Sequence, residues 1–175
     1  MKTIVAAIDS SKHSAKVLQR AAGEAVNHDA ELILVHAVSP HELSNEELEY
    51  AEKRCGEKFR KLVGGGVLSE FQSSDEANPP SMKKFIRARD LFFKFHGEDL
   101  LKQAGEDARK QGVKSVRTVL KEGAAAKAVL EAARDENADL IVIGRSGQGR
   151  IAEFFLGSTA RKILNNADRS VLTVE

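Results

Sequence analysis

The stretch IVIGRSGQGRIAEFFLGSTARKIL, residues 141–164, decides the fold because it joins an apolar strand to a helix through a glycine-rich loop. Together with Leu140, its first three residues form an apolar run that leads directly into Gly144, and Gly147 and Gly157 follow before Ser158. A short, β-branched apolar run followed by turn residues is typical of a strand in a parallel sheet that is covered on both faces. The stretch therefore predicts a buried strand that ends at Gly144 and a helix that begins near Ser158.

Four other segments have the character of strands: residues 3–8 (TIVAAI), 31–38 (ELILVHAV), 115–120 (SVRTVL) and 170–175 (SVLTVE). Segments with apolar residues at helical spacing separate them. Strands that alternate with helices form right-handed crossovers, which produce a parallel sheet with helices on both faces. The sequence predicts a small, doubly wound α/β domain with five strands.

The predicted helices each bury one apolar stripe. The first helix, residues 12–28, is expected to bury Ala15, Leu18, Ala22, Ala25 and Val26, and the helix over 124–136 to bury Ala125, Ala128, Val129, Ala132 and Ala133. In the last helix, residues 158–167, we expect Ser158 as the N-cap and expect Ile163 and Leu164 to face inward.

Residues 40–97 do not follow this alternation. A chain of 175 residues with 42% hydrophobic residues is long enough for one well-formed core. We therefore predict a single domain over 1–175, with 40–97 as a partly helical insertion after the second strand. Long connections of this kind are usually functional or mobile.

Part of this insertion, residues 82–95, is basic and rich in phenylalanine. The basic residues are Lys83, Lys84, Arg87, Arg89 and Lys94, and the aromatic ones are Phe85, Phe92, Phe93 and Phe95. Such a mixture can bind single-stranded nucleic acid or a membrane surface, which would make the protein a nucleotide-free interaction module. Alternatively, the apolar residues share one helical face and pack onto the sheet or a second subunit. A third reading makes the insertion a lid over a binding pocket.

Overall charge and cysteine content narrow the function classes. The net charge is +1 and the pI is about 7.9, so no global field recruits nucleic acid or an anionic membrane. The single cysteine, Cys55, forms no internal disulfide, which fits the reducing cytoplasm. No apolar run approaches the ~18 residues that span a membrane. We expect a cytoplasmic protein without a membrane or nucleic-acid partner.

The first group of glycines, Gly144, Gly147 and Gly149, can bring the backbone close to an anion. Glycine has no Cβ, and positive φ angles tilt successive N–H groups into an anion-binding nest. The alternative is that Gly144 and Gly147 only form a tight exit from the strand.

The second group, Gly157, Ser158 and Thr159, begins a helix, where N–H groups and the helix dipole favour an anion. The side chains of Arg145 and Arg150 add positive charge nearby. The Ser158 hydroxyl can either cap its own helix or donate to a phosphate oxygen. The loop therefore has two candidate anion sites.

The complete pattern, Gly-x2-Gly-x9-Gly-Ser between the fourth strand and the last helix, resembles the nucleotide-binding signature of the universal stress protein family. Three further features support the resemblance: a first strand that ends at Asp9, a second that reads LILVHAV, and the terminal segment ADRSVLTVE. The resemblance covers residues 1–39 and about 98–175 and leaves out the insertion.

This resemblance implies a strand order of 3-2-1-4-5 and a bound adenine nucleotide, either ATP or its products ADP and AMP. It implies that Asp9 binds the ribose or approaches the phosphate and metal region, and that the Ala37 backbone reads the adenine edge. The residues implied for the phosphates and ribose are Gly144, Gly147, Gly157, Ser158 and Thr159. Ser10 follows Asp9 at the same end of the sheet, where doubly wound proteins bind ligands.

Other chemistry is less well supported by the residues. No glycine is followed by the Lys-Ser/Thr pair of a P-loop, and the first strand ends in IDSS instead of a Rossmann fingerprint. His36 has the position of a core histidine more than of a metal ligand. Asp9 could hold Mg²⁺ through ATP, with slow hydrolysis at most.

The last strand, residues 170–175, is a candidate dimer interface. An uncovered edge strand promotes association, and pairing with its copy in a second subunit would satisfy it by two-fold symmetry. We therefore expect a homodimer or partner-binding surface whose state depends on nucleotide occupancy.

Overall fold

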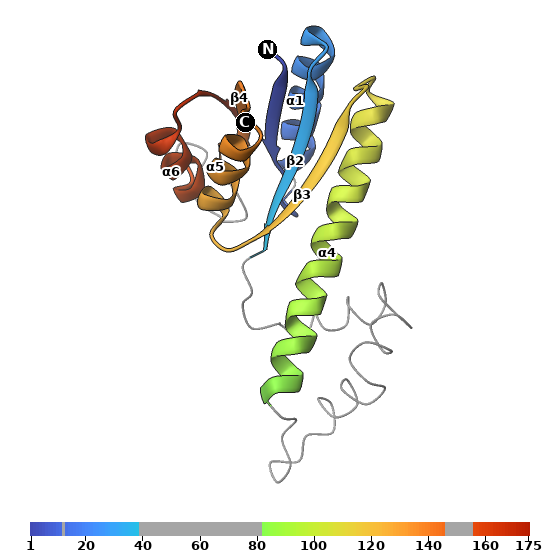
Figure 1. Cartoon of the computed structure of the whole chain (residues 1–175), viewed down its shortest axis with the longest axis vertical. Helices are drawn as coiled ribbons and strands as arrows, with labels where there is room; N and C mark the ends of the chain where they lie inside the picture. Colours follow the sequence, from blue (N-terminus) through green and yellow to red (C-terminus); the bar gives the residue numbers. More distant parts are fainter. Residues whose placement is uncertain (12, 39–81, 146–155) are drawn as a thin grey trace. The chain divides into compact units, whose positions relative to one another are not determined.

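The computed structural model describes residues 1–11, 13–38, 82–145 and 156–175 (Figure 1). The chain divides into two compact units, one made of Met1–Ser39 with Gly97–Glu175 and the other of Pro40–His96. The sheet and its core belong to the first unit. The prediction of one domain with an insertion over 40–97 stays a prediction.

Five parallel strands form one sheet in the order β3-β2-β1-β4-β5. The strands are β1 (Thr3–Ala7), β2 (Glu31–Val38), β3 (Val116–Glu122), β4 (Leu140–Gly144) and β5 (Ser170–Val174). The predicted five-stranded α/β fold and its strand order are confirmed. Strands β3 and β5 form the two edges.

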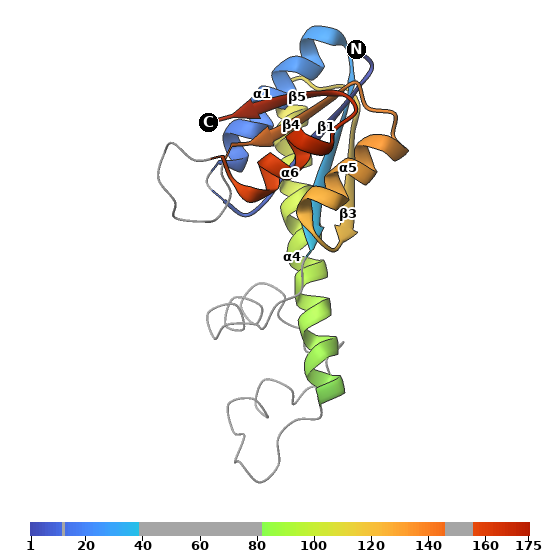
Figure 2. The ribbon, with the colours of Figure 1, turned by 90° about the vertical axis from the view of Figure 1, so that its left-hand side faces the viewer.

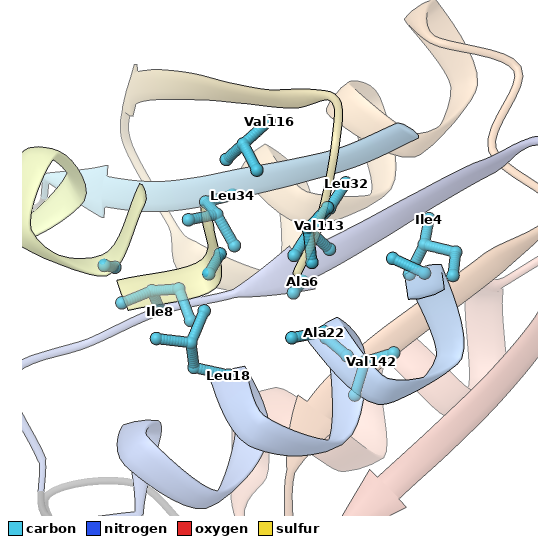
Figure 3. Close-up of a cluster of buried hydrophobic side chains, with 14 of the residues drawn as sticks. Ile4, Ala6, Ile8, Leu18, Ala22, Leu32, Leu34, Val113, Val116 and Val142 are labelled. Atoms are coloured by element: carbon cyan, nitrogen blue, oxygen red, sulfur yellow. The ribbon is translucent and has the colours of Figure 1, made fainter. Parts of the chain in front are cut away.

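Alternation along the strands divides the core between the two faces of the sheet. Ile4 and Ala6 of β1 face one cluster, whereas Val5 faces the other. The first cluster packs under α1 (Ser14–His28) and the C-terminal part of α4 (Met82–Lys110), as Figure 3 shows for the β1, β2 and α1 residues. The second packs under α5 (Ala125–Asp135) and α6 (Ser158–Asn166) (Figures 1 and 2).

Helix α4 approaches the sheet closely at Gly97. A Cβ atom at this position would lie 2.5 Å from Leu120 Cδ1 and 2.9 Å from His36 Cδ2, both shorter than normal contacts. Only glycine therefore allows α4 to pack this close to β2 and β3 without a shift.

The buried stripes differ in part from the predicted ones. In α1 the buried residues are Val17, Leu18, Ala21, Ala22 and Ala25, whereas Ala15 is exposed and Val26 is 46% exposed. In α5, Ala126 is buried in addition to Ala128, Val129, Ala132 and Ala133. In α6, Ile163 is buried, but Leu164 is 40% exposed, so the inward prediction for Leu164 is wrong. Adjacent residues of a helix point about 100° apart around its axis. The way each helix packs on the sheet therefore decides which of two neighbouring side chains is buried.

Charged groups join the amino ends of the strands. Arg117 of β3 forms ion pairs with Glu31 of β2, at 2.9 Å, and with Glu136 after α5. The hydrogen bond from Arg117 lowers the pKa of Glu31. Asp139 accepts hydrogen bonds from the backbone N–H groups of Lys2 and Thr3, and these bonds lower its pKa. The amino ends are therefore fastened by charge-assisted hydrogen bonds.

Candidate functional site

A cavity of about 460 Å³ lies at the carboxyl ends of β1, β2 and β4. Strand β1 pairs with β2 on one side and with β4 on the other, so the direction of winding reverses at this point. Doubly wound sheets bind ligands at such a switch point. Ala7, Ala37 and Gly144 line the cavity from the three strand ends, and the first turn of α6 lines its opposite side.

Asp9 lies in the cavity wall, held by two serines at the start of α1. Its Oδ1 atom accepts hydrogen bonds from the hydroxyls of Ser11 (2.6 Å) and Ser14 (2.7 Å) and from the Ser11 backbone N–H (3.0 Å). The Ser14 hydroxyl also accepts a hydrogen bond from the Asp9 backbone N–H, at 2.8 Å. These contacts fix one carboxylate oxygen and so restrict the side chain to one orientation.

His36 connects the ends of β1 and β2 beside the cavity. Its Nδ1 atom lies 2.7 Å from the Ile8 carbonyl oxygen. Because a carbonyl only accepts, Nδ1 carries the proton and donates. This partner agrees with the interpretation of His36 as a hydrogen-bonded histidine, but the residue is half-buried and lines the cavity instead of lying in the core.

The glycine-rich loop leaves and returns to the sheet at nearly the same place. The Gly157 backbone N–H donates to the Arg145 carbonyl oxygen at 2.8 Å, and the Arg145 N–H donates to the Val174 carbonyl oxygen at 2.8 Å. The Arg145 side chain lines the cavity and forms an ion pair with Glu175, at 2.6 Å. The backbone bonds hold the start of α6 against the end of β4.

Helix α6 points its N-terminus into the cavity wall. Its N-cap is Gly157, with φ −58° and ψ 152°, so the prediction of Ser158 as N-cap is wrong by one residue. Intrahelical bonding starts with Arg161 N–H donating to the Gly157 carbonyl at 2.9 Å. The three amides before Arg161 therefore have no intrahelical acceptor, as is usual for a first turn. Ser158 and Thr159 are exposed and line the cavity.

Seven of the ten predicted site residues line this one cavity: Asp9, Ala37, Gly144, Arg145, Gly157, Ser158 and Thr159. Ser10 does not line it and lies instead in a groove between α1 and α4. Gly147 and Gly149 lie outside the described residues. Gly144 ends β4 in extended backbone, and the described glycines with positive φ are Gly112 and Gly123, so the predicted nest does not include Gly144.

The sequence analysis missed four polar residues of the cavity: Ser11, His13, Ser14 and Arg161. Arg161 could have been predicted from the sequence, because it follows Gly157 by four residues and therefore lies on the same face of α6. The serines carried a weaker signal, since Asp-x-Ser turns are common wherever a helix follows a strand.

The described residues do not support a preformed metal site. Among them, no group of three or more His, Cys, Asp or Glu residues is placed to hold a metal ion. Of the described residues that line the cavity, Asp9 is the one with a carboxylate side chain. A divalent cation at Asp9 would thus require further ligands from the nucleotide and from water.

The Phe-rich segment is described only in part, since the side chains of residues 82–89 and 91 lie outside the described ones. Phe92 is 3% exposed, contacts Phe93 edge-to-face with ring centroids 5.4 Å apart, and stacks on His96. The burial of Phe92 agrees with packing better than with a surface that presents aromatic rings to a ligand. Within the described part of the chain, no helix is long and apolar enough to cross a membrane.

These features define a doubly wound α/β protein with a cavity at the switch point of its sheet. The model of the universal stress protein family matches residues 1–63 and 65–175, and the chain belongs to this family. A universal stress protein of Thermus aquaticus, encoded in the QAH/OAS sulfhydrylase 3' region, is 31% identical over 99% of this chain and 98% of its own length.

Solved structures agree with the fold. A universal stress protein UspA from Lactobacillus plantarum superposes with a TM-score of 0.64 at 19% identity, over 99% of this chain and 97% of that one. A universal stress protein in complex with cAMP superposes with a TM-score of 0.60 at 21% identity, over 99% and 96% of the two chains.

Proposed function

We propose that this protein binds an adenine nucleotide, with ATP as the principal ligand, and acts as a nucleotide-dependent regulator in the stress response. The observation that carries the proposal is the cavity that gathers Asp9, Ala37, Gly144 and Ser158 from segments far apart in the sequence. Its volume lies within the roughly 300–1,000 Å³ that is typical of small-molecule sites. The solved relative with cAMP supports the choice of an adenine nucleotide.

Each part of the cavity suits one part of the nucleotide. The first-turn amides of α6 and the Ser158 and Thr159 hydroxyls suit the phosphates, because donors at a helix N-terminus bind anions. The fixed carboxylate of Asp9 suits the ribose hydroxyls or a phosphate-bound Mg²⁺ ion. The end of β2 at Ala37 offers backbone groups to the adenine edge. Gly147 and Gly149 complete the phosphate site in this proposal.

Nucleotide occupancy would be communicated to the edge of the sheet through β5. Arg145 lines the cavity and is joined to β5 by its hydrogen bond to Val174 and by its ion pair with Glu175. Residues 170–175 are the proposed homodimer contact, and β5 is an edge strand. We propose that bound ATP changes this edge or a protein-binding surface in the reducing cytoplasm, without rapid turnover.

The first experiment is to denature the purified protein and identify the released small molecules by chromatography. Titration of the emptied protein with ATP in a calorimeter follows. Copurified or tightly bound adenine nucleotide supports the proposal. If no adenine nucleotide is released and ATP does not bind, the proposal is contradicted, and Gly157 and Ser158 serve only to begin α6.

The double variant Gly157→Val, Ser158→Val tests the position of the site. Valine can adopt the observed backbone angles of Gly157, so the fold should survive while the added side chain blocks the approach of phosphate. We expect ATP affinity to fall roughly 10- to 100-fold, the loss of one or two charge-assisted hydrogen bonds. The matched control is Gly23→Val on the exposed face of α1, where a Cβ meets nothing within 4 Å. An unchanged affinity in the double variant would refute the site.

A further inference from the structure

The two arginines of the cavity differ in their partners. Arg145 is paired with the Glu175 carboxylate at 2.6 Å. Arg161 also lines the cavity, but its guanidinium makes no ion pair with a carboxylate of the described residues. Arg145 therefore already has a carboxylate partner within the protein, whereas Arg161 has none among the described residues and its charge is available to a ligand.

Arg161 stands where a helix normally avoids positive charge. It is the fourth residue of α6, and the first turn of α6 contains no acidic residue. The dipole makes a helix N-terminus favourable for anions and unfavourable for cations. A helical side chain also leans toward the turn that precedes it, so Arg161 lies over the face that carries Gly157 and Ser158. An arginine at this position costs stability without an anion nearby and gains a partner when an anion binds.

The position of Arg161 along α6 suits the outer phosphates of a bound nucleotide. Gly144 and Gly157 lie where β4 and α6 meet, and Asp9 follows the neighbouring strand β1 in the wall of the same cavity, so this region suits the ribose and the first phosphate. Arg161 lies one turn further along α6, about 6 Å from Gly157 along the axis. Its long side chain is suited to the second or third phosphate of a chain that starts beside Gly157.

We propose that Arg161 is the residue that determines phosphate number, favouring adenine di- and triphosphates over adenosine monophosphate. The inference rests on the proposed function and deepens it, since it assigns the preference among nucleotides to one side chain. Arg145, held by Glu175, contributes to every phosphate-bearing ligand alike.

The test compares the affinities for ATP and AMP in the emptied parent protein and in Arg161→Gln. We expect ATP affinity to fall about five- to tenfold in the variant, the worth of one charge-assisted contact at a solvent-accessible site. AMP affinity should stay within about twofold, because AMP lacks the outer phosphates. The melting temperature without nucleotide should be equal to or higher than that of the parent, since an unfavourable charge is removed from the helix start.

The matched control is Lys162→Gln, which removes the same charge from the next residue of the same helix, outside the cavity lining. This variant also removes one positive charge from the start of α6, but not from the cavity. The ratio of its affinities for ATP and AMP should therefore equal that of the parent. Arg161→Lys keeps the charge and should recover part of the preference.

Three outcomes would overturn the inference. An unchanged preference in Arg161→Gln shows that Arg161 does not contact the outer phosphates. An equal loss for ATP and AMP places its contact on the shared part of the nucleotide or makes its role structural. Binding of neither nucleotide by the parent refutes the proposed function itself, and the assignment of Arg161 fails with it.

Discussion

At the amino end of the sheet the charged side chains bind one another, whereas at the carboxyl end they line a cavity. The amino end contains the Glu31–Arg117–Glu136 network and the contacts of Asp139 with the first strand. The carboxyl end contains Asp9 and Arg161. Both ends are polar, but at the carboxyl end the described part of the chain leaves Arg161 in a cavity wall without a carboxylate partner.

This difference follows from the geometry of parallel sheets. Helices return along the sheet antiparallel to the strands, so helix C-termini lie at its amino end and helix N-termini at its carboxyl end. The amino end can be closed by side chains that hydrogen-bond to backbone carbonyl groups, as Arg169 does with Ala133 in the last turn of α5 and with Ala138 just before β4. The carboxyl end presents N–H groups, and an external anion can satisfy these. The comparison teaches that stability and binding are assigned to opposite ends of one sheet.

The largest expected effect comes from removing a closure of the amino end, with Arg169→Met. The Arg169 side chain is 16% exposed and donates to the carbonyl groups of Ala133 and Ala138, the latter at 3.0 Å. Methionine fills similar space but leaves both carbonyls without this donor, so we expect a loss of about 2–3 kcal/mol in the free energy of unfolding. Urea denaturation measures it.

The control for this variant is Arg20→Met, which removes only an exposed pair with Glu24 on α1 and should cost about 0.5 kcal/mol or less. The affinity of folded Arg169→Met for ATP should equal that of the parent. A lowered affinity would break the separation between the two ends.

An intermediate effect is expected at the carboxyl end from Gly97→Ala. The new Cβ would press on Leu120 and on His36, whose ring is held by its bond to the Ile8 carbonyl. Overpacking costs about 1–3 kcal/mol, and the better helix propensity of alanine returns roughly 1 kcal/mol. We expect a net loss of about 1 kcal/mol and, because His36 lines the cavity, a weaker affinity for ATP.

Gly23→Ala is the matched substitution, since a Cβ there meets nothing within 4 Å. It should stabilise the protein by about 0.5–1 kcal/mol and leave ATP affinity unchanged. If both alanine variants bind ATP with the affinity of the parent, packing at Gly97 does not affect the binding site. ATP binding then depends only on the residues that line the cavity.

The smallest effect is the contribution of Glu31 to acid sensitivity. Arg117 lowers the pKa of Glu31 from its ordinary value of 4.5, so this stabilisation is fully present above about pH 4.5 and is lost as the pH falls through the lowered pKa. Melting temperatures measured from pH 7 to pH 3 should fall in the acid range. Glu31→Gln should lower the melting temperature at pH 7 and reduce the acid-induced decrease. Glu131→Gln, which loses only an exposed pair with Lys127, should retain the decrease of the parent.

The strands could be predicted from the sequence because their signal is local. Residues 31–38 form β2 over the predicted range, β4 ends at Gly144 as predicted, and β5 is one residue shorter than predicted. β-Branched apolar runs with turn residues behind them leave few alternatives in a doubly wound fold. The carboxyl ends of these strands then gathered most of the predicted site, from Asp9 to Ser158, into one cavity.

Helix faces were less predictable than strands. Ala15 and Val26 fit the stripe of α1 as well as Val17 and Ala21 do, and the packing of α1 on β1 decided between them. The N-cap of α6 is Gly157 instead of the predicted Ser158. The Gly157 N–H donates to the Arg145 carbonyl oxygen on the other side of the loop, and this contact cannot be read from the local sequence. Contacts between segments distant in the chain leave no local pattern.

The sequence by itself determined the family, the five strands and the end of the sheet at which a ligand would bind, because these depend on local apolar runs and on glycine spacing. Only the tertiary structure decided which charges are compensated. It paired Arg145 with Glu175, partly buried the Arg169 contacts and left Arg161 in the wall of the cavity. Arginines look alike in a sequence, and their roles differ because folding brings different partners within a few ångströms of each guanidinium.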